Sequence, residues 1–255
     1  MTGYRELLEK EMIEAWRTYR LGVIAGLFLV LGIISPVMTR YLPDIIRLFA
    51  PPNFVVDVPE MGIADVLDQL LKNIVQFGAL AAILVAMGSV ANEKERGTAA
   101  FILSKPVTRF SFLFAKIVAI GMVFAIAVAL GVAAAWLYTR LLFEAVPVVP
   151  WIKLGAVVWL STMVYASITF FGSTLMRTSL GAAGIGFFGL IVLSLASVVP
   201  DFNPYLPAGL IPVAKSIALS EASPDLHPLR TIAVAVLLIG GTFSLAWLRF
   251  RREEL

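Results

Sequence analysis

The chain has 255 residues, of which 60% are hydrophobic and only 15% are charged, and its mean hydropathy of +0.92 lies outside the range of soluble domains. Its net charge of +3 is modest, and it has no run of basic residues of the kind that binds nucleic acid. The absence of cysteine excludes disulfides, thiolate chemistry and zinc-finger-like sites. The composition therefore predicts an all-α integral membrane protein with no nucleic-acid partner.

The first 20 residues predict an amphipathic helix that lies in the membrane interface. Apolar side chains recur there at helical spacing, and charged side chains fill the other face. The apolar set is Tyr4, Leu8, Met12, Trp16 and Tyr19. A solvated N-terminal helix is the alternative, but the two aromatic residues beside the first apolar run favour the interface. We therefore assign residues 1–20 to an interfacial, or elbow, helix.

Residues 21–255 predict a six-helix transmembrane domain, because six apolar runs are long enough for a bilayer core, which needs about 20 residues per helix. The runs are Leu21–Met38, Ile74–Ala91, Phe112–Tyr138, Leu154–Leu175, Leu180–Val199 and Ile232–Leu248. Lys116 is the only charged residue inside any of them. Its position near one end of its span predicts that its ammonium group reaches water.

Two outer segments carry further predictions. The stretch Ile63–Ile74, after the breaker Pro51-Pro52, is amphipathic and predicts a helix that is either continuous with the second span or bent against it. The last outer segment, residues 200–228, is too rich in proline to span, yet residues 206–219 are apolar. It predicts either a short re-entrant hairpin packed against the spans or an ordinary folded loop.

Small residues recur at every fourth position of spans two and three, which predicts close helix packing. They are Gly78, Ala82 and Ala86 in one span and Gly121, Ala125 and Ala129 in the other. Packing within one chain is the simpler interpretation, and a seam between two copies is the alternative.

An even number of spans places both termini on one side of the membrane, together with the loops after the second and fourth spans. Thirteen of the twenty Lys and Arg residues lie on this side, and the other seven are Arg40, Arg47, Lys72, Arg140, Lys153, Lys215 and Arg230. The positive-inside rule then predicts cytoplasmic termini. The expected location is the cell membrane, as a multi-pass protein.

The sequence lacks the motifs of several other functional classes. No lysine follows a glycine, so the Gly-Lys core of a phosphate-binding P-loop is absent. The only histidine, His227, offers neither zinc-protease chemistry nor a catalytic triad, so we expect no catalytic or metal-binding residues. No Asp or Glu lies inside a predicted span, which disfavours ion coupling. We therefore expect an energy source outside the chain.

Four consecutive charged residues begin the segment ANEKERGTAAFILSKPVTRFSFLFAK, which follows the second span. Each charge would cost about 2.5–3.5 kcal/mol at the bilayer centre, so residues 92–111 are expected to form a cytoplasmic loop. Gly97 permits a turn, Thr98 can cap the run Ala99–Leu103, and Pro106 can end that run. A solvated connector is the simplest interpretation of these residues by themselves.

The same loop resembles the signature of type-2 ABC transporter permeases. In that family four features occur in a fixed order along the chain: Glu-x-Gly-Thr, a leucine-rich run, Pro-x-Ser/Thr-Arg and a lysine in the third span. The corresponding residues here are Glu95-Arg96-Gly97-Thr98, Ala99–Leu103, Pro106-Val107-Thr108-Arg109 and Lys116. The apolar run has less leucine than the family pattern. The interfacial helix, the six spans and the extended last outer segment also resemble the family's layout.

The resemblance implies a permease subunit of an ABC exporter that forms a translocation path as a dimer, with a second copy or a related permease. It also implies a separate ABC ATPase subunit that binds ATP and Mg, so this chain would bind no cofactor directly and would not be an enzyme. The loop between spans two and three would dock on that ATPase. Its coupling residues would be Glu93, Glu95, Arg96, Gly97, Thr98, Pro106 and Arg109.

Two other functions are compatible with the residues: an ion-coupled transporter or channel that works without an ATPase, and an intramembrane enzyme. The missing carboxylates in the spans weigh against the first, and the missing nucleophile and metal clusters weigh against the second. The sequence assigns neither a cargo nor a substrate-binding residue.

Overall fold

The computed structural model describes residues 3–49, 61–104, 107–199, 202, 205–220 and 227–253, which form helices and no strand. Among these residues, six helices are long and apolar enough to cross a membrane. This confirms the predicted all-α fold with six spans. The spanning helices are α2 (Arg20–Phe49), α3 (Ile63–Ala86), α6 (Arg109–Leu142), α7 (Val148–Leu175), α8 (Ser179–Ala196) and α10 (Pro228–Arg251).

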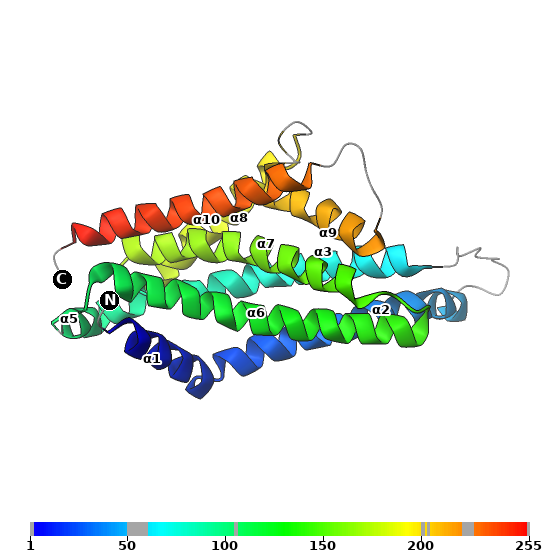
Figure 1. Ribbon diagram of the computed structural model, residues 1–255, viewed down its shortest axis with the longest axis horizontal. Coiled ribbons are helices and arrows are strands. Elements are labelled where there is room, and N and C mark those ends of the chain that lie inside the picture. The colour runs from blue at the N-terminus through cyan, green and yellow to red at the C-terminus, as the bar shows by residue number, and fades with distance from the viewer. Residues whose placement is uncertain are drawn as a thin grey trace.

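Shorter helices lie at the ends and on the flank of this bundle. They are α1 (Tyr4–Arg17), α4 (Ala91–Glu95), α5 (Thr98–Leu103), the 3-10 helix η2 (Pro207–Gly209) and α9 (Leu210–Leu219). The two termini and α5 lie at one end, which we call the terminal end (Figure 1). At the opposite, distal end, α6 connects to α7. The chain thus places α1, α5 and both termini on the same side of the bundle.

The central helix of the bundle is α7. It packs against α3, α6, α8, α9 and α10, and most of its side chains from Trp151 to Thr174 are buried. By contrast, α8 and α10 are the least buried of the six spans. Their outer faces are therefore available to lipid or to another protein.

Two glycines bring α2 and α6 into backbone contact. A Cβ at Gly131 would lie 2.7 Å from the carbonyl oxygen of Phe28, and a Cβ at Gly32 would overlap the carbonyl oxygen of Gly131. Small residues have this role in membranes because close packing, rather than exclusion of water, drives helix association there.

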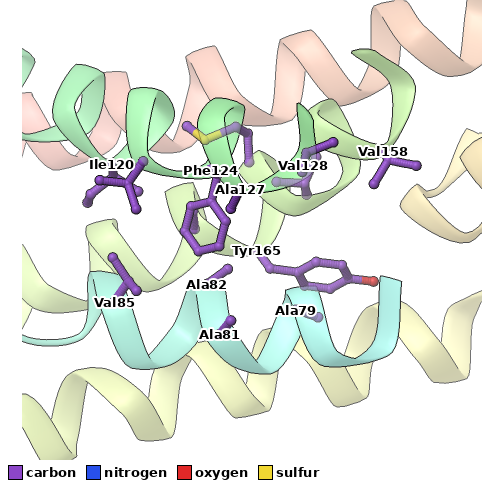
Figure 2. Close-up of a cluster of buried hydrophobic side chains, with 14 of the residues drawn as sticks. Ala79, Ala81, Ala82, Val85, Ile120, Phe124, Ala127, Val128, Val158 and Tyr165 are labelled. Atoms are coloured by element: carbon purple, nitrogen blue, oxygen red, sulfur yellow. The ribbon is translucent and has the colours of Figure 1, made fainter. Parts of the chain in front are cut away.

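Small residues of α3 also face aromatic rings of the neighbouring helices. Figure 2 shows Ala82 next to the ring of Phe124 from α6 and Ala79 next to the ring of Tyr165 from α7. All four side chains are buried. The short alanine side chains let the rings approach α3 and fill the space between the three helices.

Four of the six small residues singled out in the sequence pack within the chain; they are Gly78, Ala82, Ala86 and Gly121. Gly78 lies against Phe28 of α2 and Thr162 of α7. The other two, Ala125 and Ala129, are exposed. For these two positions, packing within one chain and a seam between two copies both stay predictions.

The structure also distinguishes the alternatives for the outer segments. The helix α3 begins at Ile63 and continues without a break to Ala86, so the amphipathic stretch is continuous with the second span. Pro51 and Pro52 lie outside the described residues.

In the last outer segment, α9 packs against α7 and α3. Its first residue, Leu210, shares a small hollow with Val157, about 15 Å from the start of α7. The described helices of this segment, η2 and α9, therefore pack against the spans.

Replacing Gly32 by valine should disrupt the contact between α2 and α6, because the new side chain would overlap backbone atoms. Overpacking costs about 1–3 kcal/mol or more. Gly26→Val on the same helix is the matched control, since a Cβ at Gly26 meets nothing within 4 Å. Thermal unfolding of the detergent-purified chain should show a lower midpoint for Gly32→Val only. An equal loss in both variants would contradict the close contact.

Candidate functional site

The loop between α3 and α6 consists of two short helices at the terminal end. After α3 ends, a turn leads into α4, and Gly97 connects α4 to α5 with a φ of 69° in the left-handed region. This confirms the turn predicted at Gly97, because a residue with a Cβ rarely adopts that conformation. Thr108 then caps α6, its Oγ1 accepting a hydrogen bond of 3.0 Å from the backbone N–H of Ser111.

The cap predicted at Thr98 is wrong. Gly97 occupies the N-cap position of α5, and Thr98 is the first helical residue. A threonine caps a helix only from the position before its first turn. The Thr98 hydroxyl instead donates to the backbone carbonyl of Glu93 at 3.2 Å, which links α5 back to α4. Pro106 lies outside the described residues.

A partly buried ion cluster, formed by Lys10, Glu11, Glu93 and Lys116, joins α1, α4 and α6. The ammonium group of Lys116 donates to Glu11 Oε1 at 2.7 Å and to Glu93 Oε1 at 2.9 Å. Lys10 donates to the same two oxygens, at 3.0 Å and 2.7 Å. Only 3% of the Lys116 side chain is exposed, against 12% for Glu11 and 14% for Glu93. Glu14 also lies 3.5 Å from Lys10 Nζ, so two ammonium groups face three carboxylates at the terminal end of the bundle.

The surroundings of the cluster keep its α1 members charged. Burial by itself would lower the pKa of Lys10, but its hydrogen bonds and attraction to Glu93 and Glu11 outweigh burial and raise that pKa. Burial would likewise raise the pKa of Glu11, but the nearby charge of Lys116 lowers it. Both shifts favour the charged forms, so α1 remains ion-paired to the bundle at neutral pH.

The prediction that Lys116 reaches water is wrong, because its ammonium group turns into the cluster instead. Glu11 escaped the sequence analysis, although a signal was present. Glu11 stands one helical turn after Leu7 and one turn before Ala15, the two buried residues of α1. A carboxylate on the buried face of α1 needs a cation, and a lysine within a span needs an anion. The two side chains are therefore candidate partners for each other.

The carboxylates do not form a metal site in this arrangement. Oxygens of Glu11, Glu14 and Glu93 lie within 4.8 Å of one another, a spacing that suits a cation. Lys10 and Lys116 already supply two positive charges to these oxygens. A bound cation would have to displace them, so the geometry fits an ion-pair network.

A second set of contacts anchors α4 to the ends of α7 and α10. The backbone N–H groups of Val90 and Ala91 both donate to Ser173 Oγ, at 3.0 Å and 2.9 Å. Lys94 donates to Glu253 Oε2 at 2.6 Å and to the carbonyl of Thr174. These contacts hold α4 against the ends of α7 and α10.

Arg109 completes this anchoring from the first residue of α6. Its Nη1 donates to the backbone carbonyls of Phe250, Arg251 and Glu253 at 3.0, 3.0 and 2.7 Å. The last carbonyls of a helix have no partner within the helix, and a cation near them is favourable. The C-terminal end of α10 is therefore held by Lys94 of α4 and by Arg109.

The predicted coupling residues consequently divide into two groups. Glu93 and Arg109 turn inward and hold the loop against α1, α6 and α10. The other described members, Glu95, Arg96, Gly97 and Thr98, are exposed. A depression of about 420 Å³ opens beside them, lined by Lys94, Glu95, Gly97, Ala99, Ala100, Arg177, Thr178 and Glu253. The loop thus has an anchored inner face and an exposed outer face.

A family model described as ABC-2 family transporter protein matches residues 7–201. The chain belongs to the ABC-2 transporter family. It is therefore a membrane transport permease in a multi-pass fold of the cell membrane, as the loop's resemblance predicted. This family consists of membrane transport subunits that are not themselves catalytic. The ABC-2 chain is also 30% identical over 256 residues to the uncharacterized transmembrane protein YxlG of Bacillus subtilis (strain 168), with 97% of each chain covered.

Lys116→Met should destabilise the permease, because it leaves the carboxylates of Glu11 and Glu93 buried with one fewer cation. Removing one partner of a buried ion pair costs about 3–5 kcal/mol. Lys153→Met is the matched control, since Lys153 is exposed in a span and surface changes stay within about 0.5 kcal/mol. Thermal unfolding in detergent should separate the two variants, and equal midpoints would show that the cluster adds nothing to stability.

Proposed function

We propose that this ABC-2 chain is the permease subunit of an exporter, and that the outer face of the loop between α3 and α6 docks on a separate ATPase subunit. ATP and Mg belong to that partner, and two permease subunits enclose the path. One observation carries the proposal: an exposed turn of charged residues is anchored by hydrogen bonds and ion pairs to α1, α6, α7 and α10. A solvated connector would need no such anchoring.

The anchoring offers a way to transmit movement. If a partner displaces α4 and α5, the ion cluster moves α1 and α6 with them, while Lys94 and Arg109 move the ends of α7 and α10. Closely packed elements shift as units rather than deforming continuously. ATP-driven movement at the loop would therefore reach four helices at once.

The outer face has the chemistry of a docking surface. Glu95 and Arg96 present opposite charges at the turn, which suits a complementary polar rim. Phe101 of α5, 68% exposed, adds an aromatic side chain of the type that often dominates interface energies. The face is only a few residues wide, which fits insertion of a short helix into a groove of the partner.

The proposed orientation puts this face in the cytoplasm, where ATP is available. The thirteen-to-seven division of Lys and Arg supports it. The structure adds that α1, α5 and both termini share one end (Figure 1). Trp16, 72% exposed on α1, is an aromatic residue suited to the interface on that side.

The proposed path follows a polar face of α3 in the distal half of the bundle. Asp68, Lys72 and Gln76 are exposed on one side of α3 and line a depression of about 540 Å³ together with Tyr165 and Ser194. Charged and polar side chains beside a span are costly against lipid and favour water or a protein partner. A second permease facing this side would enclose the path.

Removing both charges of the turn tests the coupling role. Glu95→Ala with Arg96→Ala should leave permease abundance unchanged and weaken ATPase binding. The loss should approach about 2–5 kcal/mol if the charges become buried at the interface. Arg5→Ala with Glu9→Ala removes an exposed ion pair from α1 and is the matched control. Co-purification of the ATPase and substrate-dependent ATP hydrolysis are the measurements. Control-like values for the first variant would overturn the docking proposal.

Single cysteines in this cysteine-free chain test the orientation. Arg96→Cys in the exposed turn should resist an impermeant maleimide in intact cells, whereas Glu144→Cys in the distal connection between α6 and α7 should react. After the cells are opened, both should react. The reverse pattern in intact cells would place the loop outside and exclude a cytoplasmic ATPase as its partner.

A further inference from the structure

An apolar groove of about 610 Å³ lies between α6 and α7, on their distal halves. Small residues leave the space, and three tryptophans border it. The lining residues used below are Ala125, Ala129, Trp136, Trp151, Gly155 and Trp159. None of them belongs to the anchored loop or to the proposed path along α3.

The groove offers its occupant mostly hydrocarbon. The indole N–H of Trp159 donates to the carbonyl of Gly121 at 2.9 Å, and that of Trp136 donates to the carbonyl of Val146 at 3.1 Å. Both N–H groups are therefore occupied by backbone, so these two rings present apolar surface. An apolar chain can fill such a site without leaving polar groups unpaired.

The dimensions match one leaflet of a bilayer. From Ala125 to Trp136 the groove runs about 16 Å along α6, at 1.5 Å per residue. The hydrocarbon core is about 30 Å thick, which leaves about 15 Å per leaflet. One lipid acyl chain lying along α6 would reach from one end of the groove to the other.

A positive charge stands at the distal end of the groove. Arg140, one helical turn beyond Trp136, is exposed, and its guanidinium carbon lies 5.6 Å from the centre of that indole ring. Arg140 forms no ion pair with any carboxylate that the structure describes. The exposed Glu144 follows four residues later, beyond the end of α6. A guanidinium group matches the geometry of a phosphate better than an ammonium does.

We propose that this groove binds one anionic phospholipid, with an acyl chain along the small residues of α6 and the phosphate group at Arg140. The apolar walls, the length of one leaflet and the cation at the mouth each match a different part of such a lipid. The site is independent of the proposed ATPase coupling.

Tryptophan quenching by brominated phospholipids tests the site. The background variant, Trp16→Phe with Trp247→Phe, retains only three tryptophans. They are Trp136, Trp151 and Trp159, which line the groove. The full chain is reconstituted with brominated phosphatidylglycerol or brominated phosphatidylcholine at equal mole fraction. We expect about a fivefold preference for the anionic lipid, which corresponds to about 1 kcal/mol for one basic residue at a membrane surface.

Two substitutions separate the parts of the proposal. Arg140→Gln should remove the headgroup preference while both lipids still quench. Ala129→Phe should fill the groove and lower quenching by both lipids, whereas Ala233→Phe, at an exposed alanine of α10, should not. The comparison of headgroups in the background variant stands even if Ala129→Phe fails to fold.

Equal quenching by the two lipids, or a preference that survives Arg140→Gln, would overturn the proposal. So would efficient disulfide crosslinking of Ala129→Cys between two chains in native membranes, because a second copy would then occupy the groove.

Discussion

The ion cluster around Lys116 is the constraint on which the terminal end of this permease depends. An ammonium group buried inside a membrane helix must meet carboxylates, and they come from α1 and from α4. The requirement forces three segments that are distant in sequence to meet at one place. The positions of the interfacial helix and of the loop between α3 and α6 both follow from it.

The loop therefore combines an anchored face and an exposed face in a short connection. Its inner face is fixed by charges, by Ser173 and by the carbonyl groups at the end of α10. Its outer face, at Glu95 and Arg96, remains open to a partner. Rigidity on one side gives the exposed turn a defined position relative to the spans, and a transporter driven by another subunit needs such a defined contact.

The sequence predicted the features that depend on local pattern. Apolar runs located the six spans, and Gly97 located the turn, because hydrophobic length and glycine conformation are properties of short segments. The pairing of Glu11 with Lys116 is tertiary and joins residues far apart in the chain, so spacing could not reveal it. The same holds for Gly32 against Gly131, which belong to no repeated pattern. Ala125 and Ala129 fit a packing pattern but line a groove between α6 and α7 together with three tryptophans, and spacing by itself does not distinguish the two environments.

The most direct test of the central claim is hydrogen exchange in the full-length reconstituted permease carrying Glu11→Gln. Glu11 lies on α1 and has no direct contact with the outer face of the loop. If the ion cluster positions the loop, amides of residues 91–104 should exchange faster in this variant than in the wild type. A change confined to residues of α1 would contradict the account, because the loop would then be held without the cluster.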